Sequence, residues 1–320
     1  MEFQPVDSLK LPRFAGIPTF FRLPHIEDPR GLDVAIFGVP FDGGQSYRTG
    51  SRFAPAEVRR MSAAVIKPFH PSFNVSPYDV LKIADLGDSP INPLDPAVSR
   101  QLIQDTVAKI VDAGVLPVAV GGDHSISLPI LRAAAKTHGP LGLIQVDSHV
   151  DTGDEYFGSK YGNGTPFRRA VEEGLIDPRK WAQIGIRGPV YGDEEFSFIR
   201  EHGVRSLTMD EVSRNGLDWV AQQLVWLKDT KCYVTFDIDA IDIAFAPATT
   251  SPVPGGLTSR EALVLMRHLV DFPSIVGFDL VEVQPMYDVA SITSILASLL
   301  IFEFLCTRAV VRRDDGRRVR

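Results

Sequence analysis

The chain has 320 residues, of which 44% are hydrophobic and 23% are charged, a composition typical of a soluble globular protein with a substantial core. The net charge of −7 and the isoelectric point near 5.5 exclude an electrostatic nucleic-acid-binding surface. No basic tract precedes an apolar segment at the N-terminus, and no apolar run reaches about 18 residues. We therefore expect no membrane span and a cytoplasmic location.

Strand-like and helix-like runs alternate along the chain without a Pro/Ser-rich linker, which predicts a single α/β domain over residues 1–320. Residues 1–30 combine several prolines with aromatic residues and are predicted to form an extended arm. This arm would cover the protein's own edge, a neighbouring subunit or part of the site. The Arg-rich residues 312–320 are predicted to form a solvated tail. Cys232 and Cys306 lie in apolar runs without C-x-x-C spacing, which favours buried thiols.

Hydrophobic periodicity predicts the regular elements in chain order. In the first half we expect strands at 34–39, 81–84, 116–120 and 141–146, and helices beginning at Pro55 and spanning 96–113 and 128–138. In the second half we expect strands at 181–186, 204–207, 232–236 and 275–280, and helices at 167–173, 193–202, 217–227, 259–269 and 291–306. The polar, glycine-rich residues 152–165 are too long for a simple connector and are a candidate substrate loop.

Metal-capable side chains follow two of these strands. The strand at 141–146 leads into Asp147, His149 and Asp151, which alternate onto one face of an extended segment. The strand at 116–120 leads into Gly-Gly-Asp-His-Ser, which places His124 at a second strand end. Because open α/β sheets bind ligands at the carboxyl ends of their strands, we expect these side chains to converge.

A third strand, 232–236, leads into Asp237 and Asp239, which again alternate onto one side. Three strand ends then supply six oxygen and nitrogen ligands. Clustered carboxylates repel one another unless a cation neutralises them. Acidic and imidazole ligands without cysteine suit two hard or borderline divalent ions, Mn²⁺ or Ni²⁺, better than a structural zinc.

Three motifs occur in this order: Gly-Gly-Asp-His-Ser at 121–125, Asp-Ser-His-Val-Asp at 147–151 and Asp-Ile-Asp-Ala-Ile-Asp at 237–242. They resemble the signatures of the ureohydrolase family, which includes the arginases and agmatinases. Thr-Pro-Phe-Arg-Arg-Ala at 165–170 and Asp-Leu-Val-Glu-Val at 279–283 are similar to the agmatinase and guanidinobutyrase branch. The resemblance covers nearly the whole chain. It implies an arginase-like three-layer α/β/α fold with a central parallel eight-stranded sheet, and trimers or hexamers.

The resemblance also implies roles for individual residues. One metal ion would be held by His124, Asp147, Asp151 and Asp237. The other would be held by Asp147, His149, Asp237 and Asp239, so that two aspartates bridge both ions. Metal centres of this type lower the pKa of a shared water, and the resulting hydroxide would attack the guanidinium carbon. Asp151 would orient this nucleophile, and Glu282 would pair with the substrate guanidinium.

Two departures from the family pattern bear on the substrate. The branch has His-Gly-Thr-Pro-Phe where this chain has Asn163 followed by Gly-Thr-Pro-Phe, so the imidazole that would shuttle a proton to the leaving amine is absent. The glycine-rich loop after the third motif is replaced by Ala-Thr-Thr-Ser-Pro at 248–252, which adds side chains beside the metals. We therefore count Asn163 and Thr249 as candidate substrate-binding residues.

Three functions are compatible with these residues. We favour a metal-dependent amidinohydrolase that cleaves a C–N bond of an atypical substrate, namely a substituted guanidine or a biguanide such as metformin, and releases an amine. The more conventional alternative is an agmatinase, guanidinobutyrase or guanidinopropionase that releases urea. The third is a non-catalytic or conditionally active subunit that pairs with a paralogous chain. The retention of all six ligands argues against that third reading. A deacetylase-like site with a single zinc would not need both His124 and Asp239.

Overall fold

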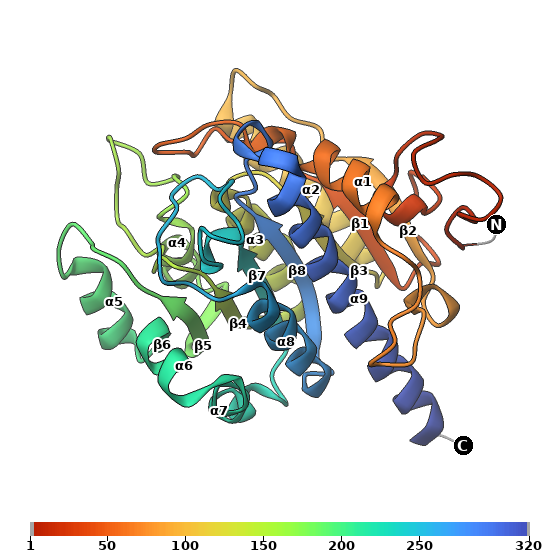
Figure 1. Cartoon of the computed structure of the whole chain (residues 1–320). Coiled ribbons are helices and arrows are strands. Elements are labelled where there is room, and N and C mark those ends of the chain that lie inside the picture. Colours follow the sequence, from red (N-terminus) through yellow and green to blue (C-terminus); the bar gives the residue numbers. More distant parts are fainter. Residues whose placement is uncertain (1–2, 319–320) are drawn as a thin grey trace.

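A parallel eight-stranded sheet forms the centre of the computed structural model, which describes residues 3–318 (Figure 1). The strands lie in the order β2-β1-β3-β8-β7-β4-β5-β6. Their bounds are β1 Val34–Gly38, β2 Ile83–Asp88, β3 Leu116–Val120, β4 Leu141–Val146, β5 Ile176–Ile186, β6 Arg205–Thr208, β7 Cys232–Asp237 and β8 Ile275–Val281. All the strand pairs are parallel, as the alternation of strands and helices predicts.

Helices cover both faces of the sheet. The helices are α1 Ala54–Val65, α2 Pro96–Asp112, α3 Ser127–His138, α4 Pro166–Glu172, α5 Glu194–His202, α6 Met209–Asn215, α7 Leu217–Gln223, α8 Ser259–His268 and α9 Ile292–Arg318. Successive residues of β1 face opposite layers: Val34 and Ile36 pack in the core beneath α1, α8 and α9, whereas Ala35 and Phe37 pack in the core with α2, α3 and α4. Because both faces are covered, the central strands are mostly apolar, with single polar residues such as Gln145 and Thr235 inside them. The predicted α/β/α architecture is confirmed.

Several predicted boundaries differ from the structure. Strand β2 begins two residues later than expected and continues to Asp88, because the buried Asp85 carboxylate is paired with Arg59 (2.9 Å) and does not end the strand. Strand β5 begins at Ile176, five residues before the predicted start. Helix α6 was not predicted at all. A capping box between Thr208 and Glu211 starts it, and that short signal lies inside a polar stretch without clear periodicity.

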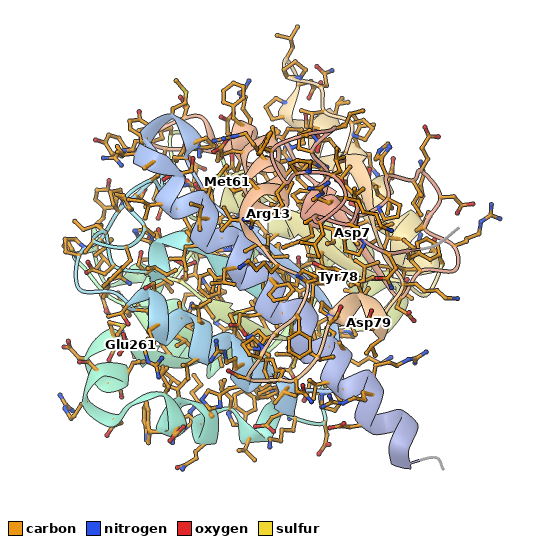
Figure 2. The ribbon with its side chains drawn as sticks, turned by 45° about the vertical axis from the view of Figure 1, so that its right-hand side comes forward. Asp7, Arg13, Met61, Tyr78, Asp79 and Glu261 are labelled. Carbon is orange, nitrogen blue, oxygen red and sulfur yellow. The ribbon has the colours of Figure 1, made fainter. Side chains whose placement is uncertain are left out.

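The N-terminal arm packs on its own chain. The backbone N–H of Phe20 donates to the Asp85 carboxylate (2.9 Å) and that of Phe21 donates to Ser62 (3.0 Å). Figure 2 shows Arg13 on the same side of the molecule as α1, where its guanidinium donates to the Val65 carbonyl (3.2 Å). Of the three placements considered from the sequence, the described residues show the arm on the protein's own sheet edge.

Helix α9 is longer and more apolar than expected. It continues to Arg318, so the backbone of residues 312–318 is helical, while 319–320 lie outside the described residues and the solvated tail stays a prediction. Among the described helices it alone is long and apolar enough to cross a membrane, which corrects the expectation that no stretch reaches this length. In the structure 67% of that apolar segment is buried. Its Glu303 is buried and accepts hydrogen bonds from Arg267 (2.7 and 3.0 Å), as in a core helix.

Candidate metal centre and cavity

Four neighbouring strands at the centre of the sheet carry the candidate site. They are β3, β8, β7 and β4, and their carboxyl ends meet at one edge. His124 follows β3, Glu282 follows β8, Asp237 ends β7 and Asp147 follows β4. Residues more than 150 positions apart in sequence are therefore neighbours. The convergence expected from the three sequence motifs is observed, and β8 adds a fourth strand end between them.

A first cluster surrounds the buried ring of His124. Its Nδ1 atom lies 3.2 Å from Asp147 Oδ2, 2.8 Å from Asp151 Oδ2 and 3.3 Å from Asp237 Oδ2. This nitrogen has no hydrogen-bond partner among the described residues although it is buried. A buried nitrogen that faces three carboxylates without a hydrogen bond is the arrangement that a divalent cation would complete.

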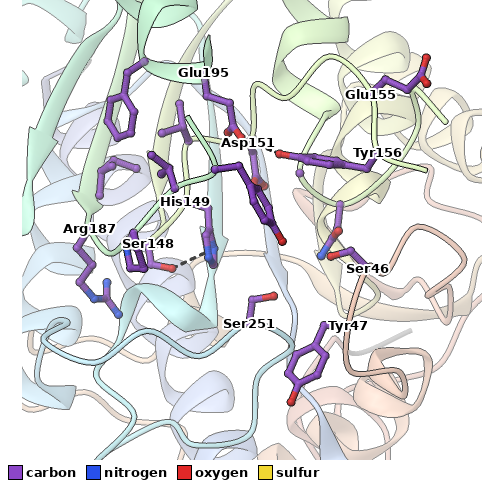
Figure 3. A pocket seen from close by; sticks show the side chains of 18 of the residues that line it. Ser46, Tyr47, Ser148, His149, Asp151, Glu155, Tyr156, Arg187, Glu195 and Ser251 are labelled. Carbon is purple, nitrogen blue, oxygen red and sulfur yellow. Dashed lines mark hydrogen bonds between the residues drawn. The ribbon is translucent and has the colours of Figure 1, made fainter. Parts of the chain in front are cut away.

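A second cluster shares Asp147 with the first. His149 Nδ1 lies 2.9 Å from Asp239 Oδ2 and 3.8 Å from Asp147 Oδ1. The ligand atoms of these three residues lie within 4.8 Å of one another, as do those of His124, Asp147 and Asp237. The imidazole of His149 is 36% exposed and faces a cavity (Figure 3). All six residues predicted as ligands thus lie together, with Asp147 common to both clusters.

The electrostatics of the two clusters show the cost of burying them without a cation. Burial, and then the charge of Asp147, raises the pKa of Asp151 to about 7. Burial, and then Asp239, raises the pKa of Asp237 well above its usual range. Burial lowers the pKa of His124, but the surrounding carboxylates raise it more, and the result lies well above the usual value. The pKa values of these facing carboxylates and of the His124 imidazole are raised because no cation offsets the buried negative charge, so the donor set fits two divalent ions.

Polar residues inside the central strands support the ligands from below. His124 Nε2 is hydrogen-bonded to Thr235 Oγ1 (2.8 Å), which donates to Asp279 (2.5 Å). Because the hydrogen bond with Thr235 occupies Nε2, Nδ1 is the ring nitrogen of His124 that faces the carboxylates. Gln145 donates to Asp147 Oδ2 (2.8 Å) and to the His149 carbonyl (3.2 Å). Sequence reasoning missed Gln145, Thr235 and Asp279. Single polar residues within apolar strand runs were the signal that could have found them.

Glu282 lies beside the first cluster and is fixed by several donors. Its carboxylate accepts the backbone N–H of His124 (2.7 Å), the side chain of Gln45 (3.2 Å) and the hydroxyl of Thr250. Both Glu282 (φ 66°) and Asp151 (φ 56°) have left-handed backbone conformations, which cost about 1–3 kcal/mol each in a non-glycine residue. Strained backbone at two adjacent carboxylates is typical of a functional site.

Asn163 and Thr249, the two candidate substrate-binding residues, differ in their position relative to the cavity. Asn163 lines the cavity, and its amide lies 3.5 Å from Glu282 Oε1, so it stands between the cavity and that carboxylate. Thr249 is buried, bridges to Val283 and is not among the residues that line the cavity. The segment reaches the cavity through Ser251 instead. Ser251 is thus the residue of this segment that lines the cavity, and the substrate contact of Thr249 stays a prediction.

The cavity has a volume of about 910 Å³ and opens from the metal-ligand clusters toward solvent. Its inner end is formed by His149, Asp151 and Asn163. Its outer part is formed by two loops, which contribute Tyr156 and Glu195 among others (Figure 3). The substrate loop predicted at 152–165 supplies residues to both parts.

Comparison with known proteins agrees with this geometry. Residues 32–307 match the model of the arginase family. The chain is 46% identical over 310 residues to guanidinopropionase of Pseudomonas aeruginosa, covering 96% of each. It superposes on proclavaminate amidinohydrolase of Streptomyces clavuligerus with a TM-score of 0.89 and 42% identity, covering 94% of this chain and 99% of the other. A Trypanosoma cruzi formiminoglutamase solved with Mn²⁺ shares the fold (TM-score 0.83, 23% identity, covering 91% and 98%).

Proposed function

The chain belongs to the arginase family and is a hydrolase of C–N bonds in linear amidines, and from this premise we propose a two-metal amidinohydrolase specialised for a substituted guanidine or a biguanide. The observation that carries the two-metal part is the buried Nδ1 of His124, which faces three carboxylates without a hydrogen bond. The observation that carries the substrate part is an amide, that of Asn163, between the cavity and Glu282.

Six residues would hold the metals, Mn²⁺ or Ni²⁺ by their ligand chemistry: His124, Asp147, His149, Asp151, Asp237 and Asp239. When bound, such ions would lower the pKa of water toward neutrality and polarise the guanidinium carbon. Asp151 borders the cavity and would accept a proton on its Oδ atoms during attack. Glu282, held by donors on both oxygens, would orient the planar guanidinium by two-point pairing.

Asn163 sets the expected substrate. An amide cannot transfer a proton near neutral pH, so an alkylamine leaving group would depart without a general acid at this position. A biguanide carries a second amidine unit within reach of its own leaving nitrogen and would need no such acid. We therefore favour a biguanide such as metformin, or a substituted guanidine, over agmatine and ω-guanidino acids.

The runner-up is a guanidino acid hydrolase that releases urea. The 46% identity to guanidinopropionase of Pseudomonas aeruginosa favours it. It requires that another group supply the proton and that the cavity accept a carboxylate. A subunit that becomes active only with a paralogous partner is the remaining alternative.

The proposal can be tested by purifying the chain with each metal, counting the bound ions by mass spectrometry and assaying a panel of substrates. The panel contains agmatine, 3-guanidinopropionate, 4-guanidinobutanoate and metformin, and urea, ammonia and free amine are all followed. We expect two ions per chain and the highest turnover on the biguanide or a substituted guanidine. Robust agmatine hydrolysis by the unmodified chain would overturn the substrate proposal and leave the metal proposal standing. If the chain binds two metal ions but hydrolyses none of the compounds, the result would favour a subunit that is active only with a paralogous partner.

Asn163→His tests the proton argument directly. A placed general acid contributes about 10² to 10⁴ in rate, so this variant should gain at least about ten-fold in agmatine turnover through partial recovery of that effect. Ser46→His is the matched control, because Ser46 lines the same cavity at another position and an imidazole there should give no gain. Equal gains in both variants, or none in Asn163→His, would contradict the assigned position of the missing acid.

A further inference from the structure

The outer part of the cavity is rich in carboxylate and aromatic groups and poor in available cations. Glu155, Glu195 and Asp151 are the acidic residues that line the cavity, and Arg187 is the one arginine or lysine among the described lining residues. Every guanidino substrate carries its head group toward the metal clusters, so what distinguishes substrates here is the charge of the opposite end.

Arg187 is not available to bind a carboxylate. All its N–H groups are directed at backbone carbonyls: Nε toward Val253 and Pro254 (3.3 and 3.2 Å), Nη1 toward Gly185 and Ala240, and Nη2 toward Asp239 and Val253 (both 2.7 Å). To pair with a substrate carboxylate, it would have to leave these carbonyls unsatisfied. Arg187 therefore joins a strand end to the loop at 253–254 and does not serve as an anion anchor.

The next cation, Arg48, is also held away from the cavity. Its guanidinium lies 4.8 Å from the ring centre of Tyr287 and 5.6 Å from that of Tyr47, and Nη1 donates to the Thr249 carbonyl (3.2 Å). Arg48 is not a lining residue. Among the described residues that line the cavity, a carboxylate in its outer part would thus meet no lysine or arginine that is free to pair with it.

A carboxylate does face the cavity from the opposite loop. Glu195 lies in the first turn of α5, and among the described residues its Oε1 accepts a hydrogen bond from the Tyr156 hydroxyl (2.7 Å). That hydroxyl fixes the direction of the Glu195 side chain, and Figure 3 shows Glu195 above His149 and Tyr156 beside Asp151. The ring of Tyr191 lines the same cavity as this pair. Carboxylate and aromatic faces together are the surroundings that bind cations.

We infer that the Tyr156–Glu195 pair forms a subsite for a positively charged distal end, so that the substrates are guanidino compounds with a second cationic or charge-delocalised group and not ω-guanidino acids. The inference rests on the proposed function, because that function places the guanidino head at the metal clusters. A carboxylate tail would be repelled by Glu195 and would lose its hydration without gaining a partner. The charge of the tail then separates this chain from a relative named for guanidinopropionate.

Three ligands with the same four-carbon spacer and head group test the subsite: agmatine, butylguanidine and 4-guanidinobutanoate. Dissociation constants are measured by calorimetry on the Mn²⁺-loaded chain, so the result does not depend on turnover. We expect agmatine to bind about ten-fold more tightly than neutral butylguanidine, as for a partly desolvated charge pair, and 4-guanidinobutanoate to bind most weakly. Tightest binding of 4-guanidinobutanoate would overturn the inference.

Glu195→Gln should remove the preference for agmatine over butylguanidine. Glu194→Gln is the matched control, because Glu194 is the adjacent residue, carries the same charge and pairs with Arg168 (2.9 Å) outside the cavity lining. If Glu195→Gln fails to fold, Tyr156→Phe provides a second test, with a reduction of the preference by about two- to four-fold. An unchanged ligand order in both cavity variants would also overturn the inference. If the three ligands bind in the expected order of affinity but none is hydrolysed, the subsite is supported and the proposed activity is not.

Discussion

The inner and outer ends of the cavity are built in opposite ways. At the inner end five of the six metal-ligand candidates are buried at the ends of central strands, with Asp147 at 0% and Asp237 at 3% exposure, and only the His149 imidazole is partly exposed. At the outer end, Tyr191 is fully exposed and Phe157 is 94% exposed, and both belong to loops. Groups that must be held at fixed distances lie on rigid strands, whereas groups that select a substrate lie where sequence can change at little cost in stability. Changes at the inner end should therefore abolish activity, and changes at the outer end should redirect it.

The largest loss of metal and activity is expected when Asp237 is replaced. Asp237 ends β7 and faces His124. Asp237→Ala should lose stoichiometric metal and at least about a thousand-fold in activity, because metal catalysis supplies several kcal/mol of barrier reduction. The metal-free variant should melt no lower than the metal-free parent, since one of several repelling buried carboxylates is gone. Metal analysis and thermal melts with and without Mn²⁺ measure both effects.

Asp242→Ala is the control for this prediction. Asp242 belongs to the same sequence motif, but its carboxylate accepts the N–H groups of Gly255 and Gly256 (2.6 and 3.1 Å) and does not face His124. This variant should retain two ions. Two tightly held ions in Asp237→Ala would show that the first cluster is not a metal site.

Glu282 should show the next largest effect. If it pairs with the guanidinium, Glu282→Gln should cost about 2–5 kcal/mol in kcat/KM on the true substrate, the range for loss of one partner in a desolvated charge pair. Steady-state kinetics measure this loss, with Glu261→Gln as control, because Glu261 is confined to the capping box of α8. A change below about three-fold would remove Glu282 from the role of anchor and weaken the contrast between the two ends.

Thr235 tests whether the inner end owes its precision to the residues below it. Thr235→Val keeps the shape of the side chain but removes the hydroxyl between His124 and Asp279, which should weaken metal affinity about 10- to 100-fold. Ser127→Ala is the matched control, since Ser127 donates to the same Asp279 carboxylate (2.7 Å) without touching the imidazole. Chelator competition measures the affinity, and equal losses in both variants would point to a general effect on Asp279.

The inner end could be predicted from sequence because its ligands occupy alternate positions directly after apolar strand runs. Asp147, His149 and Asp151 show this pattern in five residues, and parallel strands bring His124 and Asp237 to the same edge. The supporting residues were missed for the opposite reason. Thr235 is a polar residue inside an apolar strand, which could have marked it as a candidate, but the sequence does not show that it lies under an imidazole.

The outer end could not be predicted because Tyr156 lies in a loop without periodicity, and the periodicity of α5 does not show which loop Glu195 contacts. Tyr156 and Glu195 are 39 positions apart, and no pattern in the sequence pairs them. The replaced loop at 248–252 was recognised as a pocket element, but which residue reaches the cavity depends on backbone direction, and Ser251 does so where Thr249 was expected. The fold was predictable in its layers and strand count, whereas α6 was missed because tertiary packing supports a short helix of weak periodicity.

The position of β8 has a consequence for how the chain is made. The last strand of the sequence lies between β3 and β7 and is the only strand that joins the first three strands to the remaining four. A nascent chain that ends before residue 275 has two partial sheets, each with an unpaired inner edge. The ligands on β3 and those on β7 and β4 meet only when β8 inserts. Assembly of the candidate metal centre would therefore wait for completion of synthesis, and the exposed edges of β3 and β7 are where premature association would begin.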